Sequence, residues 1–202
     1  KLSLSLGLVM SMSLSHAQSK VQNYPDRTVR MVVPLTTGSG ADIAGRVVAK
    51  SLAGPWKQSV IIENRPGAGG LIGTGVVVNA EPDGYTLLLG YAGTLTINPS
   101  LFDKIPFDSV KDFAPVGKIG DAILILVANN DFQGKTLADV IAFSKKDPKG
   151  ISYGTSGTGG TPNIAGELLK QKTGANLVHV PYKGGGQALG RHALAHQLEA
   201  AV

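Results

Sequence analysis

The chain has 202 residues, of which 43% are hydrophobic and 5% aromatic, so it can bury a core as one domain or as two. Its formal net charge of +5 comes from 19 basic and 14 acidic residues. These charges are scattered, and no run of Lys or Arg is long enough to follow a phosphate backbone, so we expect no nucleic-acid partner. Because there is no cysteine, the fold must be stable without disulfides.

The first residues have the pattern of a secretory signal peptide. Lys1 precedes an apolar, serine-rich stretch that runs to Leu14, and Ser15 and Ala17 are small residues at the two positions that a signal peptidase reads. The apolar stretch is too short to span a bilayer comfortably. We therefore predict a cleaved signal peptide over residues 1–17 and export to a bacterial periplasm.

From Tyr24 onward, short apolar runs alternate with amphipathic stretches, which is typical of a mostly parallel sheet covered by helices. In the first half, the pattern predicts strands at 28–34, 59–63 and 85–90 and helices at 42–53 and 71–79. We expect Gly54-Pro55 to end the first helix, and the apolar run 85–90 to be a central strand. The proline-rich stretch 98–116 is the best candidate for a domain boundary.

In the second half, the apolar run 122–128 predicts a strong strand, and further strands are expected at 151–154 and 177–180. Thr136 is the expected N-cap of a helix over 137–146, and two more helices are predicted at 163–172 and 188–195. Residues 197–202 resemble the start of another strand. The sequence therefore predicts an α/β fold with two lobes, 24–120 and 121–202, of which the second is incomplete.

Two turns rich in Gly, Ser and Thr join a predicted strand to a predicted helix, one within residues 28–52 and the other within 151–171. The first N–H groups of a helix have no partner inside the helix, and glycines and hydroxyls let a small anion approach them closely. We predict that both turns contact one anionic ligand held between two lobes.

Five segments resemble, in the same order, the Bug-type periplasmic solute receptors of tripartite tricarboxylate transporters: PDRTVRMVVPLTTGSGADIAGR, VIIENRPGAGGLIG, AEPDGYTLLLG, INPSLFDKIPFDSVKDFAPV and LVHVPYKGGGQAL. The resemblance covers residues 24–202. It implies a type II periplasmic-binding-protein-like fold that clamps a small mono- or dicarboxylate and delivers it to membrane transporter subunits. It also implies a monomer without a cofactor, and a family pattern that continues beyond Val202, so we expect a truncated member.

The resemblance further implies which residues bind the ligand. It points to the loop after the first strand, a turn after the third strand, and the loop that opens a helix in the second lobe. The implied ligand-binding residues are Thr36, Thr37, Gly38, Ser39, Gly40, Ala41, Asp42, Tyr91, Ala92, Thr94, Thr155, Ser156, Gly157, Thr158, Gly159 and Thr161. Where family members commonly have an aromatic residue followed by Pro and Gly, this chain has Leu35-Thr36-Thr37, so we expect a ligand of different shape or polarity.

Two other hypotheses stay open at this point. The first is a serine-dependent hydrolase of small esters, with Ser156 as nucleophile and His179 as base, although the sequence around Ser156 misses the Gly-x-Ser-x-Gly spacing. The second is a receptor fragment without a ligand, because missing strands would leave sheet edges open.

The remaining motifs give weaker signals. ENRPGAGG has neither the Walker A nor the dinucleotide-binding spacing, and Arg65 in this turn is expected to be a surface charge. His192, His196 and Glu199 could share one helical face, but the base of a zinc protease motif is lacking, so we expect no metal. Lys183 in PYKGGG either attracts anions or is simply solvated.

Overall fold

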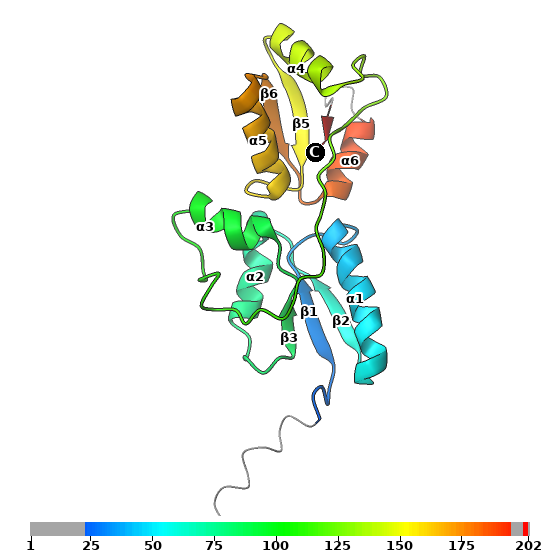
Figure 1. The fold of residues 1–202 in the computed structure, drawn as a ribbon, viewed down its shortest axis with the longest axis vertical. Coiled ribbons are helices and arrows are strands. Elements are labelled where there is room, and N and C mark those ends of the chain that lie inside the picture. Colours follow the sequence, from blue (N-terminus) through cyan, green and yellow to red (C-terminus); the bar gives the residue numbers. More distant parts are fainter. Residues whose placement is uncertain (1–22, 195–199, 202) are drawn as a thin grey trace, which may run out of the picture.

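A computed structural model describes residues 23–194 and 200–201. The predicted signal peptide, His196 and Glu199 lie outside this part, and the side chain of His192 is likewise not described. Figure 1 shows two lobes, each with a sheet flanked by helices, joined by an irregular segment that contains no helix or strand between residues 102 and 126. The predicted α/β architecture is confirmed.

The first lobe is built on a parallel sheet with the strand order β2-β1-β3. Its strands are β1 (Val29–Val33), β2 (Val60–Asn64) and β3 (Thr86–Leu88). The prediction that 85–90 forms a central strand was wrong, because β1 is the strand that pairs on both sides. Val29, Val32 and Val33 of β1 are completely buried, as expected for a strand covered on both faces.

Helices cover both faces of this sheet (Figure 1). They are α1 (Gly40–Trp56), the short 3₁₀ turn η1 (Ala68–Gly70), α2 (Leu71–Val78), the π-helical turn η2 (Gly93–Ile97) and α3 (Asn98–Leu101). Helix α1 continues through Gly54-Pro55, against the prediction, because a proline in the last turn removes only one backbone donor. The helix instead ends at Lys57, whose left-handed backbone lets its N–H donate to the Gly54 carbonyl.

The second lobe contains a mixed sheet with the strand order β4-β7-β5-β6. The strands are β4 (Val127–Ala128), β5 (Ile151–Thr155), β6 (Leu177–Pro181) and β7 (Ala200–Ala201). Strands β6 and β7 both run parallel to β5, and β4 pairs antiparallel with β7. The helices are α4 (Leu137–Lys146), α5 (Thr161–Thr173) and α6 (Gly185–Leu194).

The predicted N-cap of α4 is confirmed in detail. Thr136 Oγ1 accepts a hydrogen bond from the Asp139 N–H, and the Asp139 carboxylate accepts one from the Thr136 N–H. This capping box satisfies two backbone donors that the helix itself cannot satisfy. The helix then buries Val140 against Ile151, Tyr153 and Leu177 in the core of the second lobe.

The strong strand predicted over residues 122–128 forms only at Val127 and Ala128. In the part of the chain that the structure describes, β7 gives this segment two residues to pair with, and a strand needs a paired neighbour along its length. Ile123 and Ile125 are 87% and 68% exposed, so their apolar character finds no packing partner among the described residues.

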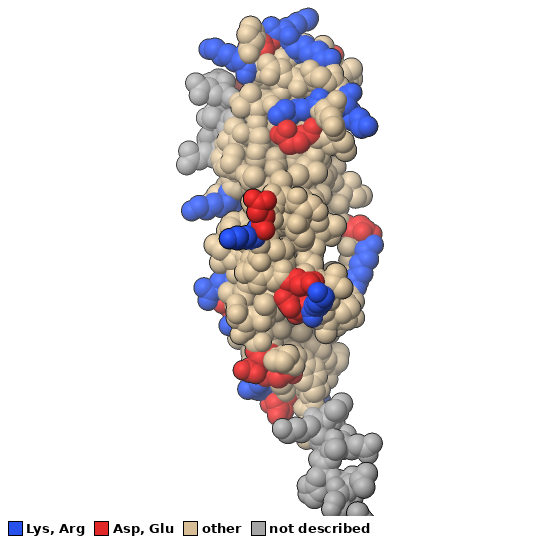
Figure 2. All heavy atoms as spheres, turned by 90° about the vertical axis from the view of Figure 1, so that its left-hand side faces the viewer, with Lys and Arg blue, Asp and Glu red and all other residues tan. Residues whose placement is uncertain are grey.

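The surface carries basic and acidic side chains that are interspersed. Figure 2 shows no continuous basic stripe over the described residues of the face in view. Arg27 pairs with Asp83 in the first lobe, and Lys170 pairs with Glu167 in the second. None of the helices within residues 23–194 is long and apolar enough to cross a membrane.

Candidate ligand-binding cleft

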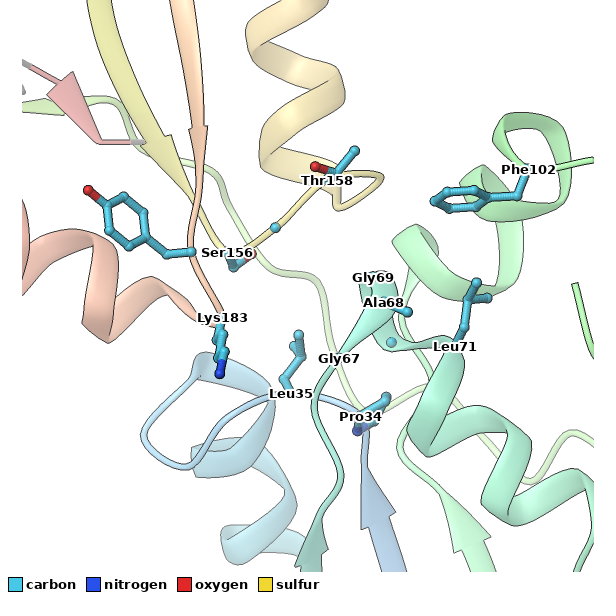
Figure 3. Close-up of a pocket in the computed structure, with 13 residues that line it drawn as sticks. Pro34, Leu35, Gly67, Ala68, Gly69, Leu71, Phe102, Ser156, Thr158 and Lys183 are labelled. Carbon is cyan, nitrogen blue, oxygen red and sulfur yellow. The ribbon is translucent and has the colours of Figure 1, made fainter.

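A cavity of about 370 Å³ lies between the two lobes (Figure 3). The first lobe contributes the residues that follow β1 and β2, together with Phe102, and the second lobe contributes the residues that follow β5 and β6. The lining residues are Pro34, Leu35, Gly67, Ala68, Gly69, Gly70, Leu71, Phe102, Ser156, Gly157, Thr158, Tyr182 and Lys183. Ligands of α/β proteins bind at the carboxyl ends of parallel strands, and here two such sheet edges face each other.

The turn over residues 67–70 forms much of the first lobe's wall. Gly67, Gly69 and Gly70 all have positive φ, at 128°, 62° and 92°, which glycine adopts without a steric penalty. A Cβ on Gly69 would lie 2.9 Å from the carbonyl oxygen of Thr158 in the other lobe. Glycine at position 69 therefore lets the turn approach the second lobe closely.

Three side chains converge on the carbonyl oxygen of Gly69. The Tyr91 hydroxyl, the Thr94 hydroxyl and the Asn98 amide donate hydrogen bonds to it, at 2.8, 3.2 and 2.9 Å. Burial raises the pKa of Tyr91, which keeps this hydroxyl protonated as a donor. An anion is repelled by a free carbonyl oxygen, and this carbonyl is fully engaged with protein donors.

The residues after the third strand that were predicted to bind the ligand include two that support the 67–70 turn. Tyr91, Ala92 and Thr94 do not line the cavity, and the two hydroxyls hold the 67–70 turn that does. Thr94 is completely buried. Tyr91 and Thr94 therefore affect the cavity wall through their hydrogen bonds to Gly69.

The first glycine-rich loop folds back on itself. Asp42 is only 2% exposed, and its carboxylate accepts hydrogen bonds from the Gly38 N–H, Arg46 and the Asn64 amide. The Arg46 hydrogen bond, helped by Gly38 and Asn64, lowers the pKa of Asp42 despite its burial. Ser39 caps α1 by accepting from the Asp42 N–H. The Asp42 carboxylate is thus part of the loop's own structure.

This internal bonding explains how little of the first loop lines the cavity. Leu35 lines it, but Thr36, Thr37, Gly38, Ser39, Gly40, Ala41 and Asp42 do not. Thr36 instead lies against Gly184 of the second lobe, where an added Cβ would overlap Thr36 Oγ1.

Of the residues predicted to bind the ligand in the second glycine-rich loop, Ser156, Gly157 and Thr158 line the cavity, while Thr155, Gly159 and Thr161 lie outside the lining. Two amides of the loop are used internally: the Gly157 N–H donates to Thr155 Oγ1, and the Gly159 N–H donates to Asn163 Oδ1. Within residues 23–194, the hydroxyls of Ser156 and Thr158 make no hydrogen bond to the protein, so both are available as donors to a ligand.

Among the described residues that line the cavity, Lys183 is the only charged one. Its ammonium group forms no ion pair with any residue that the structure describes. In Figure 3 its side chain extends from the start of α6 toward the first lobe. An unpaired cation in a lining without carboxylates favours a negatively charged ligand.

The geometry required for a serine hydrolase is not found. His179 Nε2 lies 2.7 Å from Thr155 Oγ1, and no hydrogen bond joins His179 to Ser156 in the described part of the chain. A nucleophile and its base need direct hydrogen-bond contact. Arg65, which was expected to be a surface charge, pairs with Glu63. No cluster of three potential metal ligands occurs among the described residues.

Sequence reasoning missed the 67–71 turn, Phe102 and Tyr182. A signal for the turn and for Tyr182 was present, because both follow predicted strands, and the carboxyl ends of parallel strands meet at one sheet edge. Phe102 lies in an irregular segment, and no pattern in the sequence indicates where such a residue points.

The chain is similar in structure to the periplasmic binding protein BugD, at 33% identity and a TM-score of 0.77, over 88% of this chain and 58% of that one. The chain is similar to Rpa4515 of R. palustris with adipate, at 31% identity and a TM-score of 0.80, over 88% of this chain and 59% of that one. It is also similar to MatC of Rhodopseudomonas palustris with bound malate, at 30% identity and a TM-score of 0.81, over 88% of this chain and 60% of that one. These similarities confirm the predicted periplasmic-binding-protein-like fold.

Residues 44–201 match the sequence profile of the tripartite tricarboxylate transporter family receptor, and the chain belongs to this family. It is 37% identical to a UPF0065 protein from the TAR-I ttuE-ttuC' intergenic region of Agrobacterium vitis, over 83% of this chain and 48% of that protein. It is 34% identical to the protein BugT of Bordetella pertussis, over 91% of this chain and 57% of that protein. The chain spans about half the length of these relatives.

Proposed function

We propose that this protein is a solute receptor that captures a small mono- or dicarboxylate in the cleft between its lobes. The observation that carries the proposal is the character of the cavity lining. It includes Ser156, Thr158 and Lys183, and none of the described residues that line it is acidic. Such a lining favours a carboxylate over a cation.

The affinity would come from charge-assisted hydrogen bonds to the ligand. Each such bond contributes about 1.5–3 kcal/mol when donor and acceptor are well placed. Glycines 67, 69 and 157 allow close approach of the backbone on both sides of the cavity. Adipate and malate in two related structures support a carboxylate as the ligand class.

The partners and location belong to the same proposal. The receptor would deliver its ligand to the membrane subunits of a tripartite tricarboxylate-type transporter, which the family name supports. It would act as a monomer in the periplasm, exported by a signal peptide over residues 1–17, with 24–120 and 121–202 as the two lobes of the clamp.

We further propose that the protein binds without catalysing a reaction. The engagement of His179 with Thr155 supports this, because it leaves Ser156 without a base. An assay with an activated ester tests the alternative. Turnover that is abolished by Ser156→Ala would establish the hydrolase instead.

Isothermal titration calorimetry of the full chain with malate, adipate and their diamides tests the proposed function. We expect the dianions to bind and the diamides not to bind. Ser156→Ala should weaken binding by removing a lining hydroxyl, whereas Ser152→Ala, on β5 and outside the cavity, should bind like the wild type. Equal affinity of acid and diamide, or no effect of Ser156→Ala, would count against the cleft as a carboxylate site.

Urea unfolding of the same chain tests the hypothesis of a fragment without a ligand. A cooperative transition that shifts to higher urea when malate or adipate is present supports the receptor. A broad transition that no carboxylate shifts would favour the fragment.

A further inference from the structure

A partly buried hydrogen bond lies next to the second ligand loop. His179 Nε2 on β6 lies 2.7 Å from Oγ1 of Thr155, the last residue of β5. Thr155 is completely buried, and His179 is half-buried. A hydrogen bond shielded from water is costly to break, because its partners lose their solvation without compensation.

The Thr155 hydroxyl connects this histidine to the cavity. Thr155 Oγ1 accepts a hydrogen bond from the Gly157 N–H and lies 3.2 Å from the Gly157 carbonyl oxygen, to which it can donate. Gly157 lines the cavity between Ser156 and Thr158. Its φ of 131° is a conformation that other residues rarely adopt, so the turn depends on contacts that hold it in place.

The far end of the same loop is held independently. The Gly159 N–H donates to Oδ1 of Asn163, which is 6% exposed on α5. The loop is therefore fixed by one buried side chain on each side, and Thr155 is the one on the strand side.

His179 is itself fixed by its surroundings. Its ring packs on Tyr153 of β5, with 5.2 Å between the ring centroids, and the Tyr153 hydroxyl donates to Glu167 of α5. Glu167 and Lys170 are the charged groups of α5 whose fields act on His179. Burial lowers the pKa of His179, so the ring is held neutral against Tyr153 at neutral pH.

From this geometry we infer that His179 is a positioning residue for ligand binding, which sets the place of the Ser156–Thr158 segment through the Thr155 hydroxyl. The inference rests on the proposed function, since it assigns a role in the same cleft. His179 does not line the cavity and need not touch the ligand. Its effect on affinity passes through Thr155 and Gly157.

Four variants of the full chain test this role. His179→Phe keeps a ring against Tyr153 but removes Nε2, His179→Gln restores an N–H donor, and Thr155→Val removes the hydroxyl at constant shape. Ser144→Ala is the matched control, because Ser144 is a completely buried hydroxyl of the same lobe that bonds to Ile141 and Asn176, away from the cavity.

Calorimetry with malate and adipate should show about two- to tenfold weaker binding for His179→Phe and for Thr155→Val, the range expected for one lost hydrogen bond. The double variant should bind no more weakly than either single variant, and His179→Gln should recover affinity. Ser144→Ala should leave affinity unchanged even if it unfolds at lower urea. Wild-type affinity in His179→Phe, or an equal loss in Ser144→Ala, would overturn the inference.

Hydrogen exchange at the Gly157 amide, measured without ligand, separates this inference from the proposed function. Exchange should be faster in His179→Phe and Thr155→Val than in the wild type and in Ser144→Ala. If the wild type binds no carboxylate, the proposed function fails, while faster exchange would still support His179 as the residue that shapes the loop. Unchanged exchange would overturn that role.

Discussion

Gly184 of the second lobe lies directly against Thr36 of the first. A Cβ at Gly184 would overlap Thr36 Oγ1 and would lie 3.0 Å from Thr36 Cβ and 3.3 Å from Thr36 Cγ2. Rotating the Thr36 side chain does not move Thr36 Cβ, so it cannot relieve the contact between that atom and a Cβ at position 184. Glycine at position 184 thus allows the two lobes to meet beside the cavity.

Gly184→Ala should therefore keep the lobes apart and weaken the binding of malate or adipate, with little change in unfolding. Gly185→Ala is its control, because a Cβ at Gly185 meets nothing within 4 Å. Calorimetry checks both variants. Equal affinities for the two would mean that contact between Gly184 and Thr36 is not needed for binding.

Lys183 should contribute by its charge. We expect Lys183→Gln to weaken dicarboxylate binding by about three- to tenfold at low salt, because a partly exposed charge interaction is screened by solvent. Increasing the salt concentration should weaken the wild type more than the variant. Lys172→Gln, an exposed residue near the end of α5, should behave like the wild type. An identical salt dependence of Lys183→Gln and wild type would contradict this role.

Gly166 permits α5 to pack on Tyr153. A Cβ at Gly166 would lie 2.5 Å from Tyr153 Cζ and 2.6 Å from its hydroxyl oxygen, and Tyr153 is 1% exposed. Gly166→Ala should destabilise the protein by about 1–3 kcal/mol in urea unfolding, since a packed core resists added volume. Gly190→Ala in α6, with no atom within 4 Å, should be neutral or stabilising by up to about 1 kcal/mol. The reverse order of stabilities would refute the packing argument.

Asn98 should stabilise the 67–70 turn through the Gly69 carbonyl. Asn98 is completely buried, and Asn98→Ala removes one of three donors to that oxygen. We expect a loss of about 1–3 kcal/mol in thermal or urea unfolding, together with weaker ligand binding. Asn79→Ala removes an exposed hydrogen bond to Gly75 and should cost less than about 1 kcal/mol. Similar losses in both variants would show that burial at Asn98 adds nothing.

His179 makes stability depend on pH. Burial lowers its pKa from 6.5 in the folded protein, so folding favours the neutral ring. This contribution is fully present above pH 6.5 and is lost as the pH falls through the lowered folded pKa. Urea unfolding between about pH 7 and about pH 5 should therefore show a smaller loss of stability in His179→Gln than in the wild type. Equal losses would mean that another group titrates there.

Local signals predicted much of the fold. Thr136 was predicted as the N-cap of the helix that begins at Leu137, and its side chain caps α4. An N-cap depends on residues close in sequence, so the pattern alone reveals it. The strand predicted over 122–128 was wrong for most of its length, because apolar character predicts a strand without indicating which strand pairs with it.

The site was predicted only in part, for a related reason. The family resemblance pointed to Ser156, Gly157 and Thr158, which line the cavity, and also to residues that do not. The sequence could not show that the Asp42 carboxylate is hydrogen-bonded to and paired with Arg46, because side-chain contacts within a loop depend on the three-dimensional shape of the loop. Sequence spacing gives the strand ends, and the structure decides which of their groups face the cleft.

A crystal structure of the full chain grown with malate or adipate tests the central claim most directly. We expect a carboxylate group in the cavity between the lobes, within hydrogen-bond distance of the Ser156 and Thr158 hydroxyls. We also expect the Lys183 ammonium group on the same side of the ligand as a carboxylate. An anion bound elsewhere, with the cavity filled only by water at saturating ligand, would contradict this claim.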